Sequence, residues 1–156
     1  QDRTNAMPTA TGKLFGNGLL NLFDGGVIWG TDDTYLALLT TAGNSALDID
    51  NWDNWDDAVS YEVTGTNWSA NGVQADGETL SLVTANNDVE FDITDESTST
   101  VTLSDGKCLI VYTRTPASDA ARELIGYAAF DTALAPAGGT LLLDFATTGF
   151  VLIDYT

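Results

Sequence analysis

Between residues 27 and 155 the chain is a succession of short apolar segments separated by turns rich in Gly, Asn and Asp. Several segments alternate apolar and polar residues with a period of two, which is typical of half-buried strands. Because no long helical pattern lies between them, we expect an all-β protein, a single-domain β-sandwich or jelly-roll-like barrel. The expected strands are 27–29, 34–41, 59–63, 80–82, 89–93, 100–103, 108–115, 124–130, 140–145 and 150–155.

Turn signals separate these segments. The clearest is Asp105-Gly106, which predicts a hairpin between 100–103 and 108–115. Residues 85–88 and the pair Gly138-Gly139 are also expected to form turns.

The N-terminal part of the chain predicts one short or broken helix, over residues 12–26, that caps the sheets. Gly25-Gly26 ends the apolar pattern. Gly16 and Gly18 weaken the helix, each by up to ~1 kcal/mol relative to alanine. The apolar residues expected on one side of it are Leu14, Phe15, Leu19, Leu20, Leu22 and Phe23.

Residues 1–11 are expected to form an N-terminal arm and residues 12–156 the sandwich domain. Met7 is the only methionine, and the run from Met7 to Ala10 is typical of a translation start. Residues 1–6 would then be an expression-derived leader; alternatively, Gln1 follows a processing cut.

The charge of the chain excludes several classes of partner. Five basic residues stand against 23 acidic ones, for a net charge of −18. Nucleic acids and anionic membrane surfaces both require clustered Lys and Arg, so we expect neither. No run approaches the ~20 apolar residues of a membrane helix. The chain has no histidine and one cysteine. Most catalytic constellations that a sequence reveals use these residues, so we expect no enzymatic activity.

The segment 48–57 is unusually acidic. Five carboxylates within ten residues repel one another, which raises their pKa values or recruits a cation. Calcium binds several oxygen ligands at once, so this segment is a candidate calcium site. The calcium-loop pattern with a central glycine and a terminal glutamate is absent, and the alternative is a solvated loop. The candidate ligands are Asp48, Asp50, Asp53, Asp56 and Asp57.

Three further groups of side chains are candidates for function. Trp52, Trp55 and Trp68 suit sugar binding beside carboxylates, or alternatively anchor a surface loop. Arg114 and Arg122 are expected to pair locally with Asp119 or Glu123, or else to meet the acidic face of another copy. Cys108 lies in an apolar strand with no histidine to activate it, so we expect a structural thiol.

The order of elements resembles a family of small all-β structural proteins of tailed bacteriophages, the capsid cement or decoration proteins. The resemblance covers roughly residues 12 to 155. It is carried by the apolar entry at 14–23, the strands at 35–39 and 88–93, the pair of apolar segments at 108–112 and 124–131, and the run from 135 to 145.

This resemblance implies a non-enzymatic virion protein on the exterior of the capsid, without a cofactor. Its partners would be the major capsid protein and further copies of itself, as a homotrimer. We expect contacts from two regions, the N-terminal segment and the 48–57 loop, together with the two arginines. Two alternatives stay open: an extracellular carbohydrate-binding β-sandwich, and a subunit of another assembly such as a tail or filament. The expected contact residues are Met7, Leu14, Phe15, Trp52, Trp55, Arg114 and Arg122.

Overall fold

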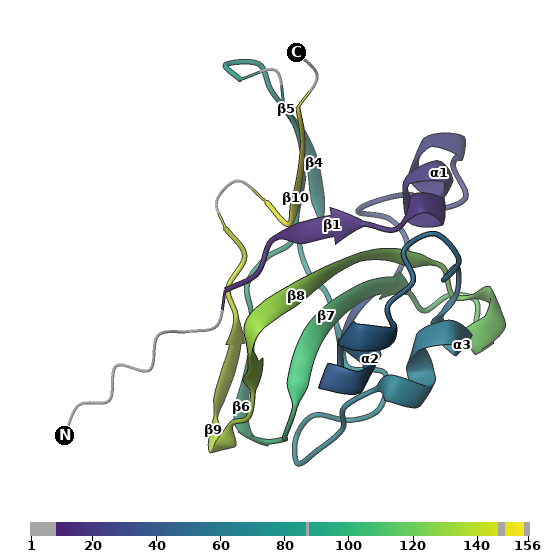
Figure 1. Ribbon diagram of the computed structural model, residues 1–156. Helices are drawn as coiled ribbons and strands as arrows, with labels where there is room; N and C mark the ends of the chain where they lie inside the picture. The colour runs from purple at the N-terminus through teal and green to yellow at the C-terminus, as the bar shows by residue number, and fades with distance from the viewer. Residues whose placement is uncertain (1–8, 87, 147–148, 155–156) are drawn as a thin grey trace.

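The computed structural model describes residues 9–86, 88–146 and 149–154 (Figure 1). Strands predominate, and the fold is all-β and sandwich-like with a short N-terminal helix, as the sequence predicts. The strands are β1 (Gly12–Leu14), β2 (Thr34–Leu39), β3 (Val73–Gln74), β4 (Thr79–Val83), β5 (Asp88–Asp92), β6 (Glu96–Thr102), β7 (Gly106–Thr113), β8 (Leu124–Leu134), β9 (Ala137–Leu143) and β10 (Val151–Asp154). The helices are α1 (Gly16–Asp24), α2 (Thr41–Ala46) and α3 (Trp55–Ala58), with 3-10 turns η1 (Val59–Tyr61) and η2 (Asp119–Ala121).

The strands form one central sheet and two small ones. The central sheet has the order β1-β8-β7-β2-β3, and the small sheets have the orders β10-β5-β4 and β6-β9. All paired strands run antiparallel. Figure 1 shows β4, β5 and β10 extending away from the body of the molecule, whereas β6 and β9 lie at its opposite end.

The central sheet is buried on both faces, which explains why β2 and β7 are apolar along almost their whole length. Successive side chains of a strand point to opposite faces, so each of these strands supplies two cores. The core shared with the small sheets includes Leu36, Leu38, Leu109, Val111, Phe91, Ile93, Val101 and Leu141. The core on the helical side includes Phe15, Ala37, Leu39, Trp55, Ala58, Cys108, Ile110, Tyr112, Leu124 and Tyr127.

Two expected strands are absent from the structure. Residues 27–29 form an unpaired loop that packs inward, with Val27 buried and the Trp29 ring edge-on to Phe91 at 5.6 Å. Residues 59–61 form η1, because a capping box between Asn54 and Asp57 starts α3 just upstream and the chain continues helically.

The predicted hairpin at Asp105-Gly106 is also wrong. β6 pairs with β9, and β7 pairs with β2 and β8, so this bend transfers the chain from one sheet to another. The Asp105 carboxylate accepts hydrogen bonds from the backbone N–H of Thr41, at 3.0 Å, and from its hydroxyl, at the start of α2. The Asp105 side chain therefore binds the start of α2, and the bend does not connect two paired strands.

Two glycine-rich segments differ from expectation for separate reasons. Gly138 and Gly139 lie inside β9, opposite a register shift in β6, so they form an irregular strand instead of a turn. Gly12 opens β1, which pairs with residues 126–128 of β8, and the helix begins only at Gly16. The helix ends as expected, with Gly25 at φ +84°.

Candidate interaction surface

The carboxylates of the 48–57 loop bond to nearby protein groups separately. Asp48 accepts hydrogen bonds from the Asn51 side chain and from two backbone N–H groups, which hold its pKa below the ordinary value. Asp57 accepts from the N–H groups of Asp53 and Asn54, at 3.0 and 3.3 Å. Asp50 and Asp56 are exposed, and Asp53 accepts from Asn17.

No group of three or more metal-ligating side chains gathers anywhere in the described ranges, which include this loop. The calcium prediction for Asp48, Asp50, Asp53, Asp56 and Asp57 is therefore wrong in this arrangement. Local backbone donors satisfy Asp48 and Asp57 in place of an ion.

The tryptophans do not form a platform for sugar. Trp55 and Trp68 are 0% and 1% exposed. Trp52 is half-buried, and its ring stacks on Tyr61 at a centroid distance of 5.9 Å. A stacking sugar needs an exposed aromatic face, so only Trp52 retains any capacity for the predicted contact. The prediction of Trp55 as an interface residue is wrong, because its ring lies in the core on the helical side.

The three contact residues predicted in the N-terminal part of the chain also differ in burial. Phe15 is fully buried, with its ring 5.1 Å from that of Tyr127, so its predicted interface role is wrong. Leu14 is half-buried against the core shared with the small sheets. Met7 lies outside the described residues.

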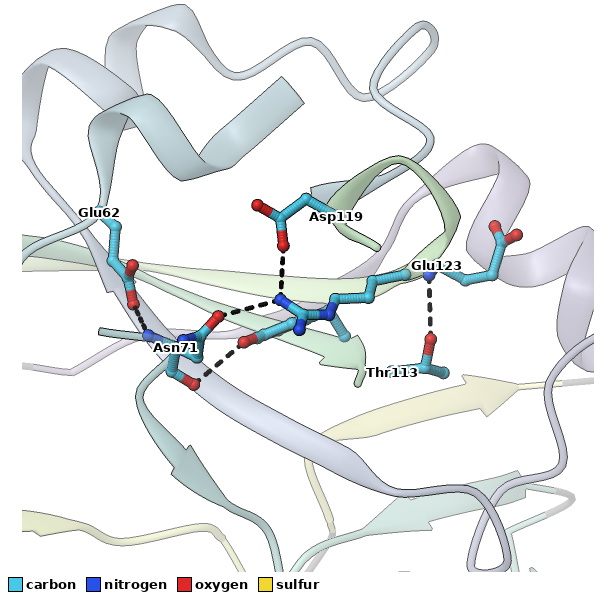
Figure 2. A network of polar contacts seen from close by, with 7 residues as sticks. Glu62, Asn71, Thr113, Asp119 and Glu123 are labelled. Carbon is cyan, nitrogen blue, oxygen red and sulfur yellow. Dashed lines mark hydrogen bonds and ion pairs between the residues drawn. The ribbon is translucent and has the colours of Figure 1, made fainter. Parts of the chain in front are cut away.

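A polar network surrounds Arg122 near the end of the central sheet (Figure 2). The Arg122 Nη1 donates to Asp119 Oδ1 at 2.5 Å and to Asn71 Oδ1 at 3.0 Å. Asn71 in turn accepts at its carbonyl from the Tyr112 hydroxyl, and its N–H donates to Glu62 at 2.5 Å. The predicted local pairing of Arg122 with Asp119 is confirmed.

This network is structural. Arg122 is 8% exposed, so its alternative role as an exposed contact is wrong. Its hydrogen bonds join the turn at Asn71 to η2 and to β7, although the buried Arg122 Nε has no partner among the described residues. Arg114 is half-buried, and its guanidinium lies 4.7 Å above the Tyr35 ring. It is therefore only partly accessible for the predicted contact with another molecule.

The network also predicts a pH dependence of stability. Burial raises the pKa of Glu62 above its ordinary value of 4.5, with a further contribution from the nearby Asp119 charge. The folded protein therefore binds this proton more tightly than the unfolded chain does, and ionisation of Glu62 lowers stability as the pH rises above 4.5. We expect Glu62→Gln to unfold at higher urea than the wild type at neutral pH, with the difference closing in more acidic buffer.

Urea titrations of both proteins at neutral and acidic pH measure this effect. Asp50→Asn, which removes an exposed loop carboxylate, is the control and should leave the difference between the two pH values as in the wild type. A Glu62→Gln protein that is less stable than the wild type at neutral pH would show that the accepted hydrogen bond outweighs burial.

The feature of the surface that stands out is apolar. Five large side chains, Leu20, Phe23, Ile28, Leu80 and Leu82, are 62%, 77%, 54%, 58% and 59% exposed. We call these five residues the α1–β4 surface. Phe23, Ile28 and Leu80 line a groove of about 650 Å³ between α1, the loop after it, β4 and β5. Leu20 and Leu82 belong to α1 and β4 but are not part of the groove lining.

The position of β4 explains this exposure. β4 is the edge strand of the small sheet that extends from the body, and it pairs only with β5 in the described sheet (Figure 1). Leu80 lies opposite Phe91, which reaches the core, whereas Leu82 lies opposite Val89, farther along the extension. The alternation that predicts a half-buried strand is present, but no layer within the described ranges covers the leucines.

No protein-family model matches the chain, and comparisons with curated proteins and with solved structures found no match. Among the described helices, none has the length and apolarity needed to span a membrane. The evidence for function therefore comes from the surface itself.

A second, larger groove of about 1360 Å³ lies between residues 9–12, the end of β8, β9 and the residues that follow β9. Its large apolar side chains, such as Leu141, Leu143 and Phe150, are buried, and Thr and Ala residues supply much of the rest of its lining. Its lining includes one strongly exposed large apolar side chain, Leu142 at 42%. The α1–β4 surface has five that are more than half exposed and is the stronger candidate for an interaction.

Proposed function

We propose that this protein is a non-enzymatic structural subunit that binds the exterior of a tailed-bacteriophage capsid lattice and stabilises it. The observation that carries the proposal is the α1–β4 surface. Monomeric soluble proteins rarely expose contiguous apolar patches larger than a few hundred Å². A surface of this kind on a body with two buried cores is typical of a chain that works inside an assembly.

The choice of a capsid rests on the resemblance in the order of elements over residues 12 to 155. In this proposal the major capsid protein is the partner and the chain occupies the outside of the virion, as a homotrimer. A protein that binds only the assembled lattice stabilises it by mass action. Because a symmetric lattice repeats each contact many times, modest contacts give strong attachment.

Quantitative mass spectrometry of purified particles tests this function. We expect this chain to be present in a simple ratio to the major capsid protein. Absence from the particles, or only a handful of copies, would reject the decoration role, and a few copies located on tails would favour the tail alternative.

A further inference from the structure

The charged residues in the segments that build the α1–β4 surface are all acidic. The segments that build it and its groove, residues 16–33 and 76–92, contain no lysine and no arginine. Their acidic residues are Asp24, Asp32, Asp33, Asp76, Glu78, Asp88, Glu90 and Asp92. Asp24 lines the groove itself, whereas Asp88 is buried. The surface therefore combines an apolar centre with segments that carry negative charge and no positive charge, and this combination restricts what can cover it.

A second copy of this chain is a poor occupant. Two α1–β4 surfaces placed face to face would bring acidic surroundings together, and like charges across an interface cost several kcal/mol. The rest of the chain offers little positive charge for a different pairing. Of the described basic residues, Arg122 is buried with Asp119, Arg114 lies over Tyr35, and Lys107 donates to the Asp131 carbonyl, which leaves Lys13 exposed on β1.

Membranes and nucleic acids are equally poor occupants. Anionic lipid surfaces attract basic segments, and nucleic acids bind through contacts from Lys and Arg to phosphates. The eight acidic residues of these two segments would repel both. Charge complementarity therefore favours a basic protein surface as the occupant of the α1–β4 surface.

The exposed area suits the centre of one protein interface. Five large apolar side chains are each more than half exposed there. A standard interface covers about 800 Å² on each partner, with an apolar core and a polar rim. The leucines and Phe23 supply such a core, and Asp24 lies at its edge in the groove lining. The carboxylates of β5 point to the other face of the small sheet, because Phe91 and Val89 are the residues that pair with Leu80 and Leu82.

We infer that the α1–β4 surface docks a partner protein whose contact site presents apolar side chains flanked by lysine or arginine. Naming this partner as a capsid subunit rests on the proposed function, whereas the chemistry of its contact site does not. A further consequence is that copies of this chain, if they form a trimer, contact one another through another face.

Calorimetric titration with a pair of synthetic peptides tests the inference. The first is an amphipathic helical peptide of about 18 residues built from Leu and Lys, and the second carries Glu in place of Lys. We expect the Leu/Lys peptide to bind the wild type, and to bind the double variant Leu80→Ser/Leu82→Ser about 10- to 100-fold more weakly. Leu142→Ser, which alters an exposed leucine on β9, is the matched control and should change the affinity less than about twofold.

A fluorescence readout locates the binding. Trp29 lines the groove, so its emission should shift when the Leu/Lys peptide binds, and the shift should disappear in Trp29→Phe. Equal weakening by Leu142→Ser and by the double variant would overturn the inference, because it would reveal attraction to the net charge alone. Equal binding of the Leu/Glu peptide, or no binding of either peptide, would also overturn it.

These outcomes are separable from a failure of the proposed function. If the peptides behave as expected but the protein is absent from particles, the docking chemistry stands and the capsid assignment fails. If the protein is present in particles but the double variant binds the Leu/Lys peptide as well as the wild type does, the capsid assignment stands and contact occurs through another face.

Discussion

Replacing Trp55 with alanine is expected to lower the free energy of unfolding by about 3–5 kcal/mol. Trp55 is 0% exposed, and its ring stacks on Tyr112 with a centroid distance of 4.3 Å and an interplanar angle of 10°. It joins α3 to the helical side of the central sheet. Since small domains have a total stability of about 5–15 kcal/mol, this loss is a large share of the whole.

Urea unfolding followed by circular dichroism measures this cost. The matched control is Trp52→Ala, three residues away in the same loop, where the half-buried ring stacks on Tyr61. We expect the control to lose about 1 kcal/mol, in the range of ordinary substitutions. Trp55→Phe, which keeps an aromatic ring, is a second variant that should remain folded. A cost of only about 1 kcal/mol for both variants would mean that both rings face outward, as an interface role for both would require.

The second large effect is expected at Gly18. On helix propensity alone, alanine inside α1 would stabilise the protein by up to ~1 kcal/mol. A Cβ atom at Gly18, however, would lie 2.3 Å from the Ile125 carbonyl oxygen and 2.7 Å from that of Leu124. Neither backbone oxygen can move without disturbing β8. We therefore expect Gly18→Ala to destabilise the protein by about 1–3 kcal/mol, the usual cost of overpacking.

Gly16→Ala provides the matched control in the same helix. A Cβ atom at Gly16 would meet only the Ile49 carbonyl oxygen, at an ordinary 3.6 Å. Thermal or urea unfolding of the two variants should give a loss at Gly18 and a change within ~0.5 kcal/mol at Gly16. Equal behaviour of the two variants would mean that α1 does not pack closely on β8.

The fold class was predictable because the three longest strands of the central sheet, β2, β7 and β8, carry their own signals. The segments around β2, β7 and β8 are continuous apolar runs, and a sheet covered on both faces requires such runs. The glycine pair after Phe23 likewise marks the end of α1. These signals are local, so the printed sequence contains them in full.

Other features depend on which segments meet in space. Leu80 and Leu82 alternate as a half-buried strand should, yet nothing in β4 reveals that the protein leaves that face uncovered. Asp105-Gly106 has the residues of a hairpin turn, but the Asp105 carboxylate is used by α2, more than sixty residues earlier in the chain. The predictions of exposed contacts fail for a related reason at Phe15, Trp55 and Arg122, because tertiary packing decides burial there.

The sequence contains a signal for the helix α3 that our sequence analysis did not use. Asn54 and Asp57 have the spacing of a capping box, which predicts a helix start rather than a strand at Val59. The same signal explains Asp57 as a helix cap. The spacing of these two residues therefore weakens the calcium interpretation on sequence grounds alone.

The placement of Cys108 gives the chain an internal reporter. It is the only thiol, it has no exposed surface on β7, and burial raises its pKa to about 12. The thiolate is the form that attacks alkylating reagents, so this residue is modified only after β7 separates from its covering layers. Each modified molecule then records one opening event, and the labelling rate of free protein can be compared directly with that of protein held in an assembly.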